Sequence, residues 1–320
     1  MNGQMLQFPE NYFQEETRCG FTVSKTMKHA WAAQMEVLQR IINICEKYGL
    51  TYYAFWGTLL GVVRHEGFIP WDDDLDIAFK REDYQRFLQV AGKELPEEYL
   101  IINVHTEEEW PHFCARVTNG RTLDISESRL TQFHGCPFAV GVDIFPLDYI
   151  PRDKEAAELQ KTLLAIIRDV LPLLKYVMKE EDNAEVDLEE ARQTVESGIA
   201  KLEECCRISI ERGGNIRSQL LKLYDRLCMI YGSNDGDVLT SYPEYIKGNG
   251  FFMPKEWFGT EKMKFENMTL TVPTGYKQIL TALYGDYMTP VRGNQDHDYP
   301  FYGAQLRTLH ERGLWLDVQE

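Results

Sequence analysis

The segment between residues 51 and 80 constrains the fold more than any other part of this 320-residue chain. It begins with Thr51–Trp56, a run of aromatic and β-forming residues that favours a strand. Gly57 then breaks the run, and a short helix-like stretch follows through Arg64. Further on, residues 74–79 alternate polar with apolar side chains, which is typical of a second strand. The segment therefore predicts a strand, a tight turn, a helix and a strand in succession.

Acidic residues gather at the start of the second strand. In a strand, side chains two residues apart point the same way, so Asp74 and Asp76 would share one face while Leu75 turns into the core. Asp72 continues the same spacing. Carboxylates this close repel one another, and a cation that prefers oxygen ligands, Mg²⁺ or Mn²⁺, relieves the repulsion. The spacing predicts a divalent metal site, with a solvated acidic loop as the alternative. An EF-hand is excluded because Ile77 stands where that loop requires glycine.

Composition and charge exclude several classes of protein. Lys and Arg number 34 against 50 Asp and Glu, and the formal net charge of −16 repels the phosphate backbone of nucleic acids. Seven scattered cysteines without a CxxC pair give neither a disulfide framework nor a cysteine zinc site. The amino-terminal residues lack a signal-peptide pattern, and charges interrupt the most apolar stretch, residues 159–178. We therefore expect a cytoplasmic protein without a spanning helix and without a nucleic-acid partner.

Three regions of different character follow one another along the chain. Residues 1–152 and 236–320 mix helix and strand patterns, whereas residues 153–235 are mostly helical. We interpret the middle region as a helical insert, with an acidic bend at 180–190, that forms a small bundle of its own. We expect the residues after 284 to be irregular. The other predicted elements are helices over 28–48, 81–93 and 274–284, strands over 99–105, 112–118 and 138–145, and a hairpin of 262–265 with 268–272.

A turn of small residues followed by closely spaced aspartates is typical of nucleotidyltransferase folds. In such folds the backbone amides of the turn, here Gly57-Thr58, hold a phosphate, and the aspartates hold the metal that bridges it. The predicted fold class is therefore α+β, a nucleotidyltransferase-like mixed β-sheet core with a helical insertion. In this interpretation residues 1–152 form the catalytic core, 153–235 the insert, and 236–320 a segment that completes the catalytic domain.

The residues around this turn also resemble a known family. The run Gly57–Ile77 is similar to the signature of the LicD family, bacterial phosphocholine transferases related to fukutin and the fukutin-related protein. The resemblance continues in Val142–Asp148, Phe265–Pro273 and Leu283–Met288. It implies transfer of phosphocholine, or of a related phospho-alcohol, from a CDP-activated donor to a sugar hydroxyl of a cell-surface glycan or its lipid-linked precursor, with release of CMP. The glycan would be a lipopolysaccharide or a teichoic acid.

Three aspartates are the predicted catalytic residues and metal ligands: Asp74, Asp76 and Asp143. Asp143, on the strand 138–145, resembles the third carboxylate of nucleotidyltransferase sites. It would hold a second metal or accept the proton of the attacking hydroxyl, and a capped surface acid is the alternative. The predicted substrate-binding residues are Gly57, Thr58, Arg64, His65, Trp71 and Asp72.

Two of these predictions leave alternatives open. The Arg64 guanidinium could fork onto a diphosphate or form a structural ion pair with Asp72 or Asp73. If the alcohol is choline, aromatic rings must hold its quaternary ammonium, because that group forms no hydrogen bonds. The aromatic residues available for such a cage are Trp71, Tyr299, Phe301 and Tyr302.

The expected partners are CDP-choline or a related CDP-alcohol and a glycan acceptor, with peripheral contact to a membrane that carries the acceptor. Two other functions use the same residues. One is a nucleotidyltransferase that passes NMP to its acceptor, and the other is a catalytically silent metal-binding scaffold in glycan assembly. Intact Asp74, Asp76 and Asp143 count against the scaffold.

Overall fold

The computed structural model describes residues 5–178, 186–249, 251–292 and 299–314. The chain forms two compact units. The sheet unit contains Met1–Ile102, Cys114–Pro146 and Glu256–Glu320, and the helical unit contains Asn103–Phe113 and Leu147–Lys255. These bounds differ from the predicted boundaries after residues 152 and 235. The physical reason is that the strand of residues 141–150 continues past its predicted end and pairs with the strand of residues 238–240 inside the helical unit.

Five strands form the sheet of the sheet unit. In spatial order they are β3 (Tyr52–Ala54), β4 (Asp76–Lys80), β7 (Gly141–Ile150), β6 (Ala115–Thr118) and β5 (Leu100–Ile102). β3 pairs with β4, and β6 with both β5 and β7, in antiparallel register. Ile77 and Phe79 of β4 and Val142 and Ile144 of β7 are fully buried, as the alternation predicts. The predicted α+β class with a mixed central sheet is confirmed.

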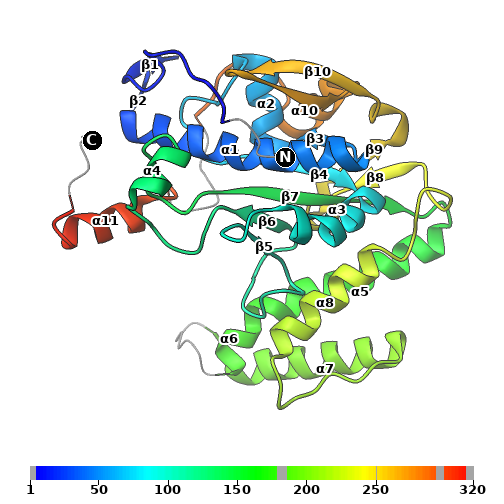
Figure 1. Ribbon diagram of the computed structural model, residues 1–320. Helices are drawn as coiled ribbons and strands as arrows, with labels where there is room; N and C mark the ends of the chain where they lie inside the picture. Colours follow the sequence, from blue (N-terminus) through cyan, green and yellow to red (C-terminus); the bar gives the residue numbers. More distant parts are fainter. Residues whose placement is uncertain (1–4, 179–185, 250, 293–298, 315–320) are drawn as a thin grey trace. The chain divides into compact units, whose positions relative to one another are not determined.

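Three helices accompany these strands: α1 (Lys25–Tyr48), α2 (Trp56–His65) and α3 (Arg81–Glu94). Helix α1 begins where the Ser24 side chain caps the amide of Met27, and it ends at Gly49, whose φ of 63° is left-handed. Glycine adopts that conformation without steric cost, which confirms the predicted helix stop. Figure 1 shows α1 lying along the strands of the sheet, and α1 packs against α3.

The carboxy-terminal part of the sheet unit is partly as expected. The hairpin of β10 (Thr260–Phe265) and β11 (Met268–Pro273) and the helix α10 (Tyr276–Tyr284) confirm the predictions. The expectation of an irregular carboxy-terminal region is wrong, because α11 (Gly303–Glu311) is a helix that buries Leu309. Further elements without a sequence prediction are β1 (Glu16–Arg18), β2 (Phe21–Val23) and α4 (Glu127–Gln132).

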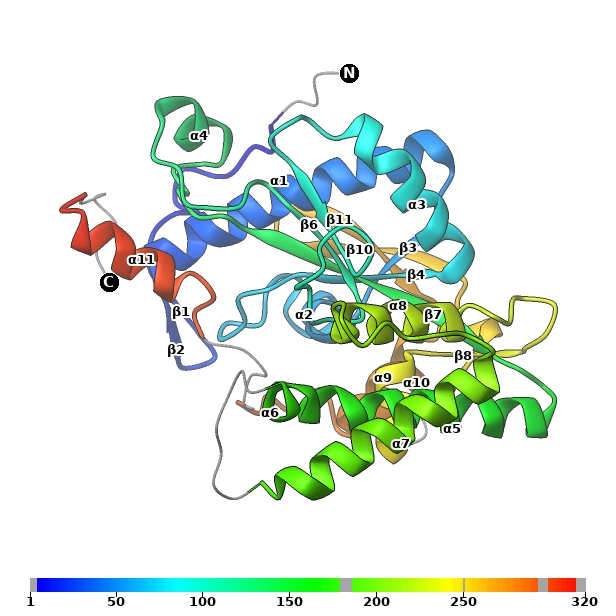
Figure 2. The ribbon, with the colours of Figure 1, turned by 90° about the horizontal axis from the view of Figure 1, so that it is seen from below.

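The helical unit contains the predicted bundle (Figure 2). Its main helices are α5 (Lys154–Val170), α6 (Leu174–Val177), α7 (Leu188–Cys206) and α8 (Ile216–Cys228). Ile167 of α5, Ile199 of α7 and Leu220 of α8 are fully buried in one core. The shorter elements are η1 (Leu171–Leu173), β8 (Val238–Thr240), α9 (Tyr242–Glu244), the π-helical η2 (Tyr245–Asn249), β9 (Met253–Pro254) and η3 (Lys255–Trp257), which runs past the end of the unit.

Two sequence-based expectations concern this unit. Part of the acidic bend, residues 179–185, lies outside the described residues. Across the part of the chain that the structure describes, no helix combines the length and the apolar character that crossing a bilayer requires. The apolar face of α5 instead packs inside the unit's own core.

Candidate functional site

The predicted strand, turn and helix meet at the start of β4. The amide of Phe55 donates to the carbonyl oxygen of Asp76 at 3.0 Å, and the amide of Asp76 donates to the Thr58 hydroxyl at 2.7 Å. Trp56 has a φ of 42°, a left-handed conformation that costs energy in a bulky residue. Thr58, predicted to bind substrate, is buried and fixes the backbone of Asp76.

Gly57 lies directly against the acidic segment. A Cβ atom at this position would stand 2.6 Å from Oδ2 of Asp72. Real side chains do not approach that closely, so a residue other than glycine would displace the carboxylate. The structure therefore brings together the predicted turn and the first predicted aspartate.

A loop, and not the predicted strand, brings the acidic residues close together. Strand β4 begins at Asp76, so the expectation that the strand starts at Asp74 is wrong and Asp74 lies in the preceding loop. The loop instead brings carboxylate oxygens of Asp72, Asp73 and Asp74 within 4.8 Å of one another. Asp73 is fully buried, and its Oδ2 accepts a hydrogen bond from the amide of Phe301 at 2.6 Å. Asp72 and Asp74 are therefore the members of this group best suited to bind a ligand.

Crowding changes the protonation of these acids. Burial, and then the negative charges of Asp74 and Asp73, raise the pKa of Asp72 well above its ordinary value. Burial, followed by Asp74, Asp143 and Asp72, raises the pKa of Asp76 in the same direction, and Arg116 opposes the shift. Carboxyl groups whose surroundings oppose ionisation suit a hard divalent cation such as Mg²⁺ or Mn²⁺. The positive charge of the cation would stabilise the ionised carboxylates.

Asp143 has a partner that the sequence analysis missed. Arg116 on β6 lies opposite Asp143 on β7, and its Nε and its second terminal nitrogen each donate to one carboxylate oxygen at 2.6 Å. Burial alone would lower the pKa of Arg116, but these hydrogen bonds and the charge of Asp143 raise it. Gly141 leaves room for the pair, since a Cβ there would stand 2.9 Å from Cδ of Arg116. The charge of Asp143 is thus already balanced by the protein.

A cavity of about 410 Å³ lies beside Asp72. Its lining includes four predicted substrate-binding residues, Gly57, Arg64, Trp71 and Asp72. The remaining lining residues are Leu60, Ile69, Tyr284, Asp286, Tyr287, Thr289 and Val291. This volume is in the range of pockets that bind small molecules and cofactors.

Arg64 is held on the cavity wall by backbone oxygens. It donates to the carbonyl oxygens of Tyr287 at 2.8 Å and of Thr289 at 3.5 Å. Its Nε donates to Nε2 of His65 at 2.9 Å. Burial, together with the nearby charges of Arg64 and Arg18, lowers the pKa of His65 to about 4, so this ring is neutral at pH 7 and can accept that hydrogen bond. His65 therefore orients Arg64.

Tyr284 is a second residue that the sequence analysis did not assign to the site. It lines the cavity, and burial followed by the charges of Asp76, Asp72 and Asp74 raises the pKa of its hydroxyl. The residue as a whole is 42% exposed. A phenol that resists ionisation can donate a hydrogen bond to an anionic ligand.

The predicted aromatic cage is only partly at the cavity. Trp71 lines the cavity, with its ring edge-on to Phe21 at 6.3 Å. Tyr302 is 4% exposed and stacks on Phe138 at 4.7 Å, so it belongs to the core and its assignment to a cage is wrong. The ring of Phe301 lies against Tyr302. Burial and the charge of Asp73 raise the pKa of Tyr299 to about 12.

Comparison with known proteins adds a second kind of evidence. A family model described as LicD/FKTN/FKRP, nucleotidyltransferase domain, matches residues 49–161. The lipopolysaccharide cholinephosphotransferase LicD of Haemophilus influenzae is 31% identical over 268 residues, which cover 82% of this chain and 91% of that protein. Human ribitol 5-phosphate transferase FKRP is 32% identical over 91 residues, or 25% of this chain and 18% of that protein. An uncharacterized Rickettsia typhi protein, RT0683, is 52% identical over 48 residues, or 15% of this chain and 16% of that protein.

Proposed function

The chain belongs to the LicD family, and from this premise we propose that it transfers phosphocholine, or a related phospho-alcohol, from a CDP-activated donor to a sugar hydroxyl of a glycan. Its relatives of established activity are a cholinephosphotransferase and a ribitol 5-phosphate transferase, and the chain is a phosphotransferase like them. The products would be the modified cell-surface glycan, or its lipid-linked precursor, and CMP.

One observation carries the proposal. Asp72 lines a cavity of about 410 Å³ together with Gly57 and Arg64. A carboxylate oxygen of Asp74 lies within 4.8 Å of one of Asp72, and the charges of both residues act on Asp76. A diphosphate donor needs a bridging cation in such an acidic place, because its own negative charges would otherwise be repelled. With Mg²⁺ or Mn²⁺ bound to Asp74 and Asp76, and to Asp72 or Asp143, the ion would neutralise charge on the phosphoryl oxygens.

The other residues have roles in positioning the donor. Arg64 uses one terminal nitrogen and its Nε for contacts within the protein, and its second terminal nitrogen offers further N–H donors for a phosphate. Gly57 lets the backbone approach the acids closely enough for one ligand to touch both. Trp71 presents an aromatic ring at the cavity, which suits a choline headgroup.

Asp143 remains the proposed third carboxylate. Its bidentate pair with Arg116 gives two ways to act in the reaction. If Arg116 turns to the substrate phosphate, Asp143 is released to bind a metal. If the pair persists, Asp143 is held in place to accept the proton of the attacking hydroxyl.

The test is the identity of the released product. Purified protein with Mg²⁺, CDP-choline labelled in the choline, and the cell-surface glycan fraction of the host should release CMP and label the glycan. CDP-ribitol and CDP-glycerol in parallel reactions identify the alcohol. Labelling of the glycan by the cytidine moiety would instead establish transfer of NMP. Absence of turnover with every donor would favour the silent scaffold.

The location of the reaction is also a proposal. We place it in the cytoplasm, with peripheral contact to a membrane-borne acceptor. The acidic chain, with its net charge of −16, argues against a nucleic-acid partner. The same negative charge is repelled by anionic lipid, which favours recognition of the acceptor through its sugar.

A further inference from the structure

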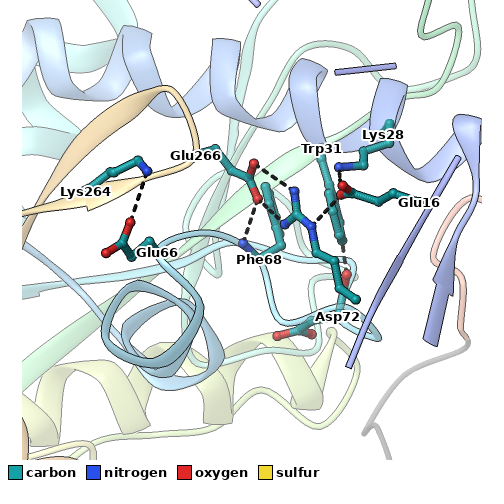
Figure 3. Close-up of polar contacts among 9 residues, drawn as sticks. Glu16, Lys28, Trp31, Glu66, Phe68, Asp72, Lys264 and Glu266 are labelled. Atoms are coloured by element: carbon teal, nitrogen blue, oxygen red, sulfur yellow. Dashed lines mark hydrogen bonds and ion pairs between the residues drawn. The ribbon is translucent and has the colours of Figure 1, made fainter. Parts of the chain in front are cut away.

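A clamp of three distant segments holds the loop that leads to Asp72 (Figure 3). The loop, residues 66–72, connects α2 to the acidic cluster. The clamp consists of Arg18 on β1, Trp31 on α1 and Glu266 at the tip of the β10–β11 hairpin. All three lie in the sheet unit.

Glu266 is fastened to the loop by its backbone and its side chain. Its amide donates to the carbonyl oxygen of Glu66 at 2.7 Å, and its Oε1 accepts from the amide of Phe68 at 3.2 Å. Between these two contacts, a Cβ on Gly67 would stand 2.2 Å from the same Oε1. The absence of a side chain at residue 67 therefore allows the carboxylate to reach the loop.

Arg18 holds the other side of this carboxylate. Its two terminal nitrogens donate to Oε1 and Oε2 of Glu266 at 2.7 and 3.3 Å. Arg18 and Lys28 both pair with Glu16, so two acids and two bases form one neutral cluster. The side chain of Glu266 is only 7% exposed. A buried ion pair of this kind adds little stability over an apolar contact, which points to a role in fixing geometry.

Trp31 connects Phe68 and Arg18 to the backbone of Asp72. Its ring stacks on Phe68 with centroids 4.4 Å apart and planes at 1°, and the Arg18 guanidinium lies 5.7 Å from the centre of the Trp31 ring. The indole Nε1 donates to the carbonyl oxygen of Asp72 at 3.0 Å. Figure 3 shows the Asp72 carboxylate pointing away from this clamp, so the clamp holds the backbone and leaves the carboxylate available.

We propose that Glu266, together with Arg18, is a positioning residue that sets the place of the Asp72 carboxylate for metal binding. This inference rests on the proposed function, because it assumes that the acidic cluster binds a divalent cation. Glu266 is not among the residues that line the cavity. It acts through the Phe68 amide and the Trp31 ring.

The test measures Mn²⁺ affinity by electron paramagnetic resonance, without substrate, in the full chain. Glu266→Gln keeps an oxygen acceptor but removes the charge that holds Arg18. Glu66→Gln is the matched control, since Glu66 pairs with Lys264 at 3.0 Å on the same hairpin and both side chains are 66% exposed. We expect Glu266→Gln to weaken Mn²⁺ binding about tenfold, the usual effect of losing a residue that supports metal ligands, and Glu66→Gln to leave it unchanged.

Two further measurements keep the inference open to refutation. If Glu266→Gln does not fold, Arg18→Gln gives the same test. It also breaks the pair between Arg18 and Glu266, but it leaves the Glu266 carboxylate in place to accept the hydrogen bond from the Phe68 amide. Kinetics should show a fall in kcat larger than the change in KM for the CDP donor. Wild-type Mn²⁺ affinity in a folded Glu266→Gln variant would overturn the inference. Failure of the wild-type protein itself to bind Mn²⁺ would overturn the proposed function instead.

Discussion

Replacing Asp74 with asparagine should have opposite effects on stability and on activity. The carboxylate oxygens of Asp72, Asp73 and Asp74 lie within 4.8 Å of one another. At that distance two unit charges repel by about 3.5 kcal/mol at an effective dielectric constant of about 20. Part of this repulsion is already relieved because the raised pKa of Asp72 lets it hold a proton. We therefore expect Asp74→Asn to stabilise the metal-free protein by about 1 to 3 kcal/mol at pH 8.

The same substitution removes a proposed metal ligand, so turnover should fall to less than about a tenth of the wild-type rate. Urea unfolding with EDTA and with Mg²⁺ separates the two effects. Mg²⁺ should stabilise the wild-type protein and have little effect on Asp74→Asn. Asp169→Asn is the control, because Asp169 is an exposed acid that pairs with Arg168 in the helical unit. Loss of stability in metal-free Asp74→Asn, or retention of wild-type activity, would refute the reasoning.

Three other predictions follow from the site. Burial and crowding raise the pKa values of Asp72 and Asp76, so their contribution to stability is present at low pH and is lost as the pH rises through the folded-state values. Mg²⁺ displaces the protons held there, and its thermal stabilisation of the protein should grow as the pH rises above the ordinary pKa of an aspartate. Gly57→Ala should lower activity about tenfold by displacing the Asp72 carboxylate, which Mn²⁺ titration would show as weaker binding. Arg64→Lys should raise KM for the CDP donor about tenfold with a smaller effect on kcat, because lysine lacks the forked donors, and a wild-type KM would exclude donor contact.

Local signals predicted much of the fold. Helix α1 follows from the spacing of its apolar residues and from the glycine at its end, and the β10–β11 hairpin follows from alternation on both sides of Glu266-Asn267. The acidic cluster was predicted from Asp72, Asp74 and Asp76, although the loop rather than the strand brings the first two together. In each case the residues that decide the structure are neighbours in the sequence.

What the sequence did not predict depends on contacts between distant segments. Arg116 meets Asp143 only through the register of β6 on β7, and nothing local to either residue specifies that register. Tyr284 reaches the cavity because α10 ends beside it. Residues 103–113 belong to the helical unit through contacts such as the one between Phe113 and Tyr224, whose ring centroids are 3.9 Å apart. Helix α11 was missed because the glycine, proline and histidine around it hide the spacing of Leu306 and Leu309.

The central claim is that a divalent cation joins the acidic cluster to the diphosphate of a CDP-alcohol. Calorimetric titration of the wild-type protein with CDP-choline, once with Mg²⁺ and once with excess EDTA, tests it most directly. The account predicts binding with Mg²⁺ and none in EDTA, because without the ion the crowded acids Asp72, Asp74 and Asp76 disfavour a diphosphate beside them more than Arg64 alone offsets. Equal affinity under the two conditions would contradict it.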